Sequence, residues 1–309
     1  MRFANGHCCK LKKGQAVGIT EGGDFMKEFI LVIIIFSLPI TAQVMLAALD
    51  AESVILLDQN SGEILYRQNE HKRLYPASTT KVMTALLVIE NGDLDEVITV
   101  GEEINLIAED SSKAGLVIGQ KISVNDLMES LMLVSGNDSA NTLAVYTARK
   151  INNEPNLDIE ASLGKFQETM NQRAKELGAM DSHFTNPHGY HDSEHYSTAY
   201  DLGIITREAM KNRSFKELVQ KPENGDWKNR NLLLNKNDAH YYPFATGVKT
   251  GYTSAAGQCL ISSASKNDID LIAVVLNSSK EGRWVVSKQL LEYGFKLLEE
   301  SKEIQRKVS

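Results

Sequence analysis

The chain has 309 residues, of which 42% are apolar and 24% charged. This composition is typical of a soluble globular protein that can bury a sizeable core, so neither a disulfide nor a structural metal ion is needed. The formal net charge of −7, without a basic stripe along the sequence, argues against a nucleic-acid-binding protein.

The N-terminal segment differs in composition from the rest of the chain. A short apolar run begins at Phe29, just after Met26-Lys27, and small residues follow it up to Ala48. This order is typical of a secretory signal peptide, so residues 26–48 are predicted to be a signal peptide or an N-terminal membrane anchor. Residues 1–25 fit neither a signal nor a fold, and we interpret them as a mis-assigned extension. The protein is therefore expected to be exported.

Strands are predicted at both ends of the remaining chain, with helices between them. Two short strands, residues 52–57 and 63–67, are joined by an Asn/Gly-type turn. Helices are expected over residues 78–90, 124–134, 139–150, 163–177, 199–211 and 281–299. Residues 93–112, 183–196 and 212–241 are expected to be mainly loops.

The C-terminal part of the chain is predicted to be a strand triplet over residues 247–252, 258–264 and 269–277. Cys259 in this region has no partner in the body of the chain and is expected to be a small buried apolar residue. A strand pair, a helical middle and a strand triplet predict one α+β domain over residues 50–300. The terminal strands then form a single antiparallel sheet, followed by a tail of residues 301–309.

A serine and a lysine stand together at the start of the first predicted helix. Ser78 and Lys81 are three residues apart and therefore share one helix face, at a helix N-terminus that favours developing negative charge. A serine beside an amine is a nucleophile beside a base. By itself the pattern is better explained by an N-cap serine with a solvated lysine, because Ser-x-x-Lys is common by chance.

Two further motifs follow in the chain. Ser135-Gly136-Asn137 lies in the link between two predicted helices, and Lys249-Thr250-Gly251 lies on a predicted strand. Lys249 alone would fit a lysine that protects an edge strand from aggregation. The ordered set Ser-x-x-Lys, Ser-x-Asn and Lys-Thr-Gly, in these structural contexts, resembles the penicillin-binding proteins and serine β-lactamases.

The resemblance is closest to the D-alanyl-D-alanine carboxypeptidases, the low-molecular-weight penicillin-binding proteins of peptidase family S11. It covers residues 51–298 and is carried by residues 75–90, 131–143, 184–201 and 247–264. It implies a serine β-lactamase/penicillin-binding-protein-like fold, with an antiparallel sheet flanked by helices plus an all-helical lobe. It also implies a serine carboxypeptidase, inhibited covalently by penicillins, that removes the terminal D-alanine from peptidoglycan stem peptides outside the cytoplasmic membrane. The family uses no metal ion or other cofactor.

The resemblance assigns a role to each motif residue. Ser78 would be the nucleophile and Lys81 its base, which requires burial and the nearby cation of Lys249 to lower the pKa of Lys81. Ser135 would relay the proton to the leaving amine, and Asn137 would orient the substrate amide.

The remaining candidates would bind the substrate. Lys249 and Thr250 would hold its terminal carboxylate, Gly251 would let the backbone approach, and the N–H groups of Ser78 and Tyr252 would form the oxyanion hole. Some relatives have histidine in place of Tyr252, so no side-chain role is assigned there. Arg283 is either a further carboxylate ligand or a surface arginine. His183, His188, His191 and His195 share one loop and are interpreted as loop hydrogen-bonders or surface residues.

Two alternatives stay open at this point. A class A β-lactamase needs a glutamate that activates the deacylating water, but Glu154 follows Ser135 too soon in the chain for that layout. A catalytically silent cell-wall-binding relative would keep the fold, although every motif residue is present here.

Many relatives continue into a second β-rich domain and an amphipathic anchor helix, whereas this chain stops at Ser309. Membrane association would then depend on the N-terminal apolar segment.

Overall fold

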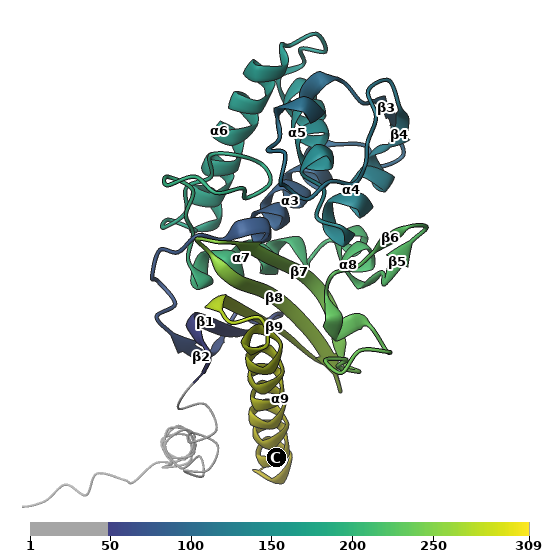
Figure 1. Ribbon diagram of the computed structural model, residues 1–309. Helices are drawn as coiled ribbons and strands as arrows, with labels where there is room; N and C mark the ends of the chain where they lie inside the picture. Colours follow the sequence, from purple (N-terminus) through teal and green to yellow (C-terminus); the bar gives the residue numbers. More distant parts are fainter. Residues whose placement is uncertain (1–48, 309) are drawn as a thin grey trace, which may run out of the picture. The chain divides into compact units, whose positions relative to one another are not determined.

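The computed structural model describes residues 49–308, so the predicted extension and signal segment lie outside the described residues. Within residues 49–308, five strands form one antiparallel sheet in the order β2-β1-β9-β8-β7 (Figure 1). The strands are β1 (Ala51–Asp58), β2 (Ile64–Gln68), β7 (Ala245–Thr253), β8 (Gly257–Lys266) and β9 (Ile269–Ser278). The prediction that both ends of the chain share one antiparallel sheet is confirmed.

Helices cover both faces of this sheet. In β1, alternate residues point to opposite faces: Ile55 and Leu57 contact Gly203 of α7 (Ala199–Ala209), whereas Leu56 contacts Gly294 of α9 (Gly282–Val308). Because neither face of the central strands meets water, β1 and β9 have nearly continuous apolar runs rather than an alternating pattern. The middle six residues of β8 and of β9 are all buried for this reason.

The other helices form a lobe at one end of the sheet (Figure 1). These are α3 (Lys81–Asn91), α4 (Val124–Leu133), α5 (Asn137–Asn152) and α6 (Ile159–Leu177), with α8 (Arg213–Gln220) between α4 and β7. Short elements complete the described chain: the 3₁₀ turns η1 (Ala77–Thr80), η2 (Glu102–Leu106) and η3 (Leu232–Leu234), and the pairs β3 (Val97–Thr99) with β4 (Lys121–Ser123) and β5 (Glu223–Asn224) with β6 (Trp227–Lys228).

Several helix predictions were wrong in detail, including that for α6, which begins at Ile159 instead of residue 163. The helix expected from Ser78 begins at Lys81, because residues 77–80 form a 3₁₀ turn, and α5 begins at Asn137, two residues early. Helix α8 lies in a region expected to be loop. It is short and mostly charged, and only Phe215, Leu218 and Val219 are buried, which is too few for a clear period. Helix α9 continues past residue 299 to Val308.

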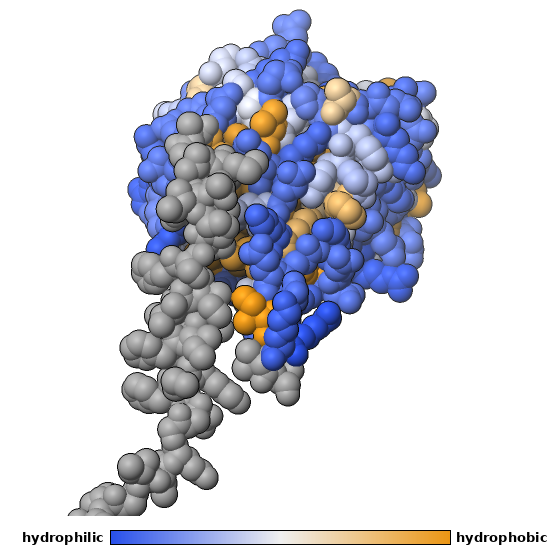
Figure 2. Space-filling model, turned by 90° about the horizontal axis from the view of Figure 1, so that it is seen from below, coloured by the Kyte–Doolittle hydropathy of each residue, from blue (hydrophilic) through white to orange (hydrophobic). Residues whose placement is uncertain are grey.

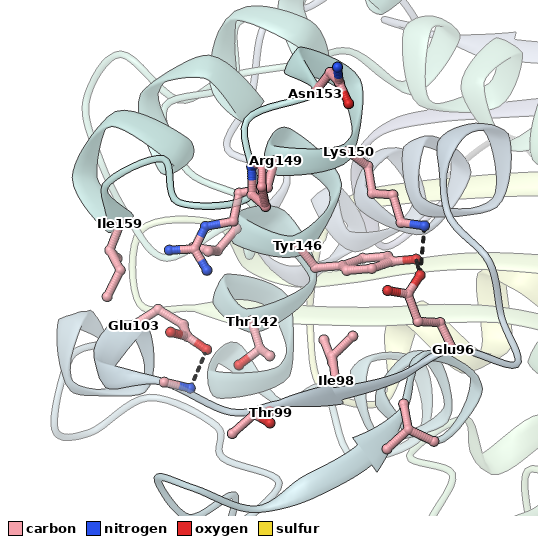
Figure 3. Close-up of a pocket in the computed structure, with 14 residues that line it drawn as sticks. Glu96, Ile98, Thr99, Glu103, Thr142, Tyr146, Arg149, Lys150, Asn153 and Ile159 are labelled. Atoms are coloured by element: carbon pink, nitrogen blue, oxygen red, sulfur yellow. Dashed lines mark hydrogen bonds and ion pairs between the residues drawn. The ribbon is translucent and has the colours of Figure 1, made fainter.

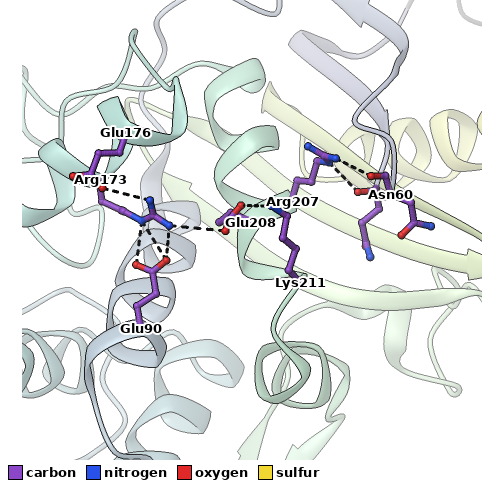
Figure 4. A network of polar contacts seen from close by, with 8 residues as sticks. Asn60, Glu90, Arg173, Glu176, Arg207, Glu208 and Lys211 are labelled. Atoms are coloured by element: carbon purple, nitrogen blue, oxygen red, sulfur yellow. Dashed lines mark hydrogen bonds and ion pairs between the residues drawn. The ribbon is translucent and has the colours of Figure 1, made fainter.

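Polar contacts join the lobe to the sheet through α7 (Figure 4). Arg173 of α6 donates to both carboxylate oxygens of Glu90 in α3 and lies 3.9 Å from Glu208 in α7. Next to Glu208, Arg207 donates to the carbonyl oxygens of Gln59 and Asn60, in the turn between β1 and β2. Helix α7 therefore bonds to the lobe on one side and to the sheet edge on the other.

The surface is polar where Figure 2 shows it. On the coloured part of that face, apolar residues form only small separate patches among hydrophilic ones. None of the helices in residues 49–308 has an apolar stretch of the length needed to cross a membrane.

Replacing Gly294 with valine tests the close packing of α9 on the sheet. A Cβ at this position would lie 2.8 Å from Leu271 Cδ1 and 2.9 Å from Leu56 Cδ2. Overpacking of this kind costs about 1–3 kcal/mol, so Gly294→Val should lower the free energy of unfolding by this amount in urea titrations. Gly164→Val in α6 is the control, because nothing lies within 4 Å of a Cβ there. Equal effects of the two variants would contradict the packing argument.

Candidate active site

The turn η1 carries Ser78 at the start of α3. Its neighbour Ala77 has a positive φ of 49°, and Thr79 is bonded back to the Pro76 carbonyl oxygen through both its N–H and its hydroxyl. A non-glycine residue in this region is strained, and such strain often occurs at functional sites. The turn thus holds the Ser78 hydroxyl just ahead of the helix N-terminus.

Lys81 is fully buried and its amine is surrounded by oxygen atoms. Its Nζ lies 3.1 Å from Ser78 Oγ, 2.7 Å from Asn137 Oδ1 and 2.8 Å from the carbonyl oxygen of His188. The amide and carbonyl oxygens can only accept hydrogen bonds. A neutral amine has two N–H donors and one lone pair, so those two oxygens use both donors. The lone pair is then directed at the Ser78 hydroxyl, as a general base requires.

The surroundings of Lys81 favour this neutral form. Burial is the main cause that lowers the pKa of Lys81 well below its ordinary value, followed by the positive charges of Lys249 and Arg230. The carboxylate of Asp138 acts in the opposite direction but is the smallest of these influences on the Lys81 pKa. A lowered pKa is what we expect if Lys81 is a base. No sequence motif indicated that Arg230 contributes to this lowering.

Ser135 lies in the link between α4 and α5, and Asn137 is the first residue of α5. Ser135 has a positive φ of 65°, and its buried hydroxyl has no hydrogen-bond partner among the described residues. Asn137 uses Oδ1 to accept from Lys81, and its N–H donates to the Ser112 carbonyl oxygen. A buried hydroxyl without a partner costs free energy, so Ser135 Oγ is available for a ligand.

Strand β7 brings the third motif against the nucleophile turn. A Cβ at Gly251 would lie 3.0 Å from the Pro76 carbonyl oxygen and 3.2 Å from Ser78 N, so only glycine allows this approach. Lys249 is buried, and its Nζ donates to the Thr250 carbonyl oxygen at 3.0 Å. Burial, together with the charges of Arg230 and Arg283, lowers the pKa of Lys249 to about 7.

The two arginines complete a cationic end of the site. Arg283 is half-buried over the Trp284 ring, and its Nε has no partner among the described residues. Arg283 is thus not a plain surface residue. Arg230, which the sequence analysis missed, donates to Ser112 Oγ at 2.7 Å and through its N–H to the Leu133 carbonyl oxygen. It lies in a loop without a motif, so no sequence signal could have found it.

The loop histidines support the site without acting as bases. His195 is buried and hydrogen-bonds Thr80 at 2.8 Å, and burial lowers its pKa to about 3. His188 accepts a hydrogen bond from Lys81 through its backbone carbonyl oxygen. Gly189 beside it has a φ of 79°, and a Cβ there would clash with the Ala77 carbonyl oxygen. His191 is exposed and stacks edge-on with Tyr75.

An open cavity of about 420 Å³ leads to the nucleophile. Ser78, Asn137 and Tyr252 are among the residues that line it. A larger cavity of about 580 Å³ lies on the helical lobe, between β3, η2 and α5 (Figure 3). It contains Glu103, Tyr146 and Arg149 but neither serine nor cysteine, so it does not repeat the serine–lysine arrangement of the Ser78 site. Glu154 is exposed beyond the end of α5 and lines no part of the Ser78 cavity.

Comparison with known proteins now identifies the family. A protein-family model described as D-alanyl-D-alanine carboxypeptidase, Peptidase S11, matches residues 40–280. The chain belongs to this family. It is 34% identical to the D-alanyl-D-alanine carboxypeptidase DacF of Bacillus subtilis, over 80% of this chain and 62% of that protein. It is 32% identical to DacB2 of Mycobacterium tuberculosis, over 80% and 83% of the two chains.

The fold of the family is matched in solved structures. The Streptomyces K15 DD-transpeptidase superposes with a TM-score of 0.74 and 30% identity, over 81% of this chain and 98% of that one. Penicillin binding protein 6B from Escherichia coli has a TM-score of 0.70 and 33% identity, over 80% and 78%. The chain spans somewhat less than two thirds of the length of several curated relatives.

Replacing Lys249 with glutamine tests the electrostatic control of Lys81. Removing this positive charge makes the protonated form of Lys81 less unfavourable, so the pKa of Lys81 rises. If the neutral amine is the base, acylation slows at low pH as Lys81 becomes protonated, and this acid limb of the pH profile moves to higher pH in the variant. The acylation rate is measured with a fluorescent penicillin. Lys296→Gln, an exposed lysine on α9, is the control and should leave the limb in place. An unmoved or downward-moved limb in Lys249→Gln would contradict this account.

Proposed function

We propose that this protein is a serine D-alanyl-D-alanine carboxypeptidase that removes the terminal D-alanine from peptidoglycan stem peptides. The observation that carries the proposal is the buried Lys81 amine, which lies 3.1 Å from Ser78 Oγ and whose pKa is lowered by burial and by nearby positive charges. Membership of the S11 family supports the substrate class.

Acylation begins when Ser78 Oγ attacks the carbonyl carbon between the last two D-alanines. The hydroxyl proton passes to Lys81 Nζ, and the developing oxyanion accepts hydrogen bonds from the N–H groups of Ser78 and Tyr252. Each such donor contributes about 2.7–4 kcal/mol in comparable enzymes. The C–N bond then breaks, and the proton moves from Lys81 through Ser135 Oγ to the leaving amine.

The cationic end of the site binds the terminal carboxylate. Lys249 and Thr250 lie on β7 two residues and one residue before Gly251, which abuts the nucleophile turn. Arg283 lowers the pKa of Lys249 by its charge, and a bound carboxylate would offset this repulsion. A protein with a net negative charge can therefore take an anionic substrate.

Hydrolysis of the acyl-enzyme completes the cycle. Lys81, neutral again, takes a proton from water as the water attacks the ester of Ser78, and it gives this proton to Ser78 Oγ when the ester C–O bond breaks. A penicillin would acylate Ser78 in the same way, because its β-lactam amide replaces the scissile peptide bond. Such chemistry belongs outside the cytoplasmic membrane, and we propose that the apolar segment before the described residues exports or anchors the protein.

Ser78→Ala tests the assignment of the nucleophile. We expect benzylpenicillin to add covalently to Ser78 in the native chain, as mapped by mass spectrometry of its peptides. In Ser78→Ala the adduct disappears, and D-alanine release from a stem pentapeptide falls at least about a thousandfold. Ser301→Ala, an exposed serine of α9, is the control and should behave as the native chain. An adduct on another residue, or unchanged D-alanine release, would overturn the assignment.

The lifetime of the same adduct separates a peptidase from a β-lactamase. No glutamate lines the Ser78 cavity in the described structure, so nothing there resembles the deacylating base of class A enzymes. We therefore expect the penicilloyl-enzyme to persist for minutes or longer. Rapid turnover of benzylpenicillin would instead favour the β-lactamase.

A further inference from the structure

We propose that Asp110 binds a free ammonium group on the acyl side of the scissile bond. The preferred substrates are then stem peptides whose side-chain amine is not cross-linked. This inference rests on the proposed function and adds the substrate class that the same site selects.

The direction of the bound peptide follows from β7. Lys249 and Thr250 come before Gly251, and Gly251 lies against Ser78 N. The cavity that contains Ser78 continues in the opposite direction, past Tyr252 to Ala255. A peptide with its terminal carboxylate at Lys249 and its scissile carbonyl at Ser78 must therefore run its N-terminal part toward Ala255.

Asp110 lies on the wall of this acyl-side cavity. Its Oδ1 accepts a hydrogen bond from the Tyr190 hydroxyl at 2.8 Å, which joins the loop after η2 to the loop that carries His188. Oδ2 has no hydrogen-bond or ion-pair partner within residues 49–308. Asp110 is exposed and presents an acidic side chain with one oxygen that has no donor.

The charges along the site change sign from one end to the other. Twelve residues line the cavity, and Asp110 is the acidic residue among them, with no lysine or arginine. Lys249 lies at the other end with the positive charge of Arg283 near it, whereas Arg230 donates to Ser112, which lines the cavity itself. A ligand that is anionic at its C-terminus and cationic on its N-terminal side is thus complementary to both ends. Cross-linking turns the side-chain amine into an amide and removes that positive charge.

A matched pair of peptides tests this recognition. Nα-acetyl-L-lysyl-D-alanyl-D-alanine carries a free ammonium, and its Nε-acetylated form does not. We expect the native chain to have kcat/KM about fivefold higher for the ammonium peptide, the upper range for an ion pair with an exposed carboxylate. In Asp110→Asn the ratio of the two kcat/KM values should fall to about one. Added salt should lower the ratio in the native chain but not in the variant.

Two further variants separate the charge from the loop contact. Tyr190→Phe removes the hydrogen bond but keeps the carboxylate, so the ratio should stay as in the native chain. Glu109→Gln removes an exposed charge one residue away that does not line the cavity, and should also leave the ratio unchanged. A ratio near one in the native chain, or a native ratio in Asp110→Asn, would refute the inference. Loss of the ratio in Tyr190→Phe would assign the effect to loop structure instead of charge and would equally refute it.

The same assay distinguishes this inference from the proposed function. If the native chain releases D-alanine from neither peptide, the carboxypeptidase assignment itself fails. If it releases D-alanine from both peptides at equal rates, the carboxypeptidase assignment stands and the role of Asp110 is wrong.

Discussion

The buried amine of Lys81 is the group on which the arrangement of the site depends. Its three oxygen partners come from the turn before α3, from the first residue of α5, and from the loop that contains His188. An amine without such partners would be costly to bury, and a charged one costlier still. The three segments must therefore meet at one point, and Gly189 and Gly251 allow the backbones to come close enough. The position of Lys81 beside Ser78 therefore depends on the packing of these three segments as well as on the spacing of the two residues in the chain.

Several features of the site lower the stability of the folded protein. Arg230 and Arg283 raise the cost of burying Lys249 as a cation, and Ser135 keeps a buried hydroxyl without a partner among residues 49–308. Ala77 and Ser135 hold strained backbone conformations. Proteins commonly accept such costs at functional sites when the rest of the structure is well packed. Here the central strands, covered by helices on both faces, provide that packing.

The proposed substrate complements each of these features in turn. Its carboxylate offsets the repulsion among the cations, its leaving amine takes the proton that passes through Ser135, and its scissile carbonyl meets the donors beside Ser78. If the acyl side carries an ammonium, Asp110 adds an interaction that a cross-linked peptide lacks. The order of charges along the site would then select the bond that is cleaved. It would also favour peptides whose side-chain amine is not cross-linked.

Much of this protein could be predicted from its sequence, because the deciding signals are local. Strand patterns at both ends indicated one antiparallel sheet, and three short motifs indicated a Ser–Lys site and its family. The sequence could not reveal α8, whose three buried residues are too few for a clear period, nor the 3₁₀ turn that precedes α3. It also could not reveal Arg230 or Asp110, because each stands in a loop without a motif. Their roles arise from charges and cavity walls that come together only when distant segments pack, since electrostatic and cavity geometry depend on distances in space rather than along the chain.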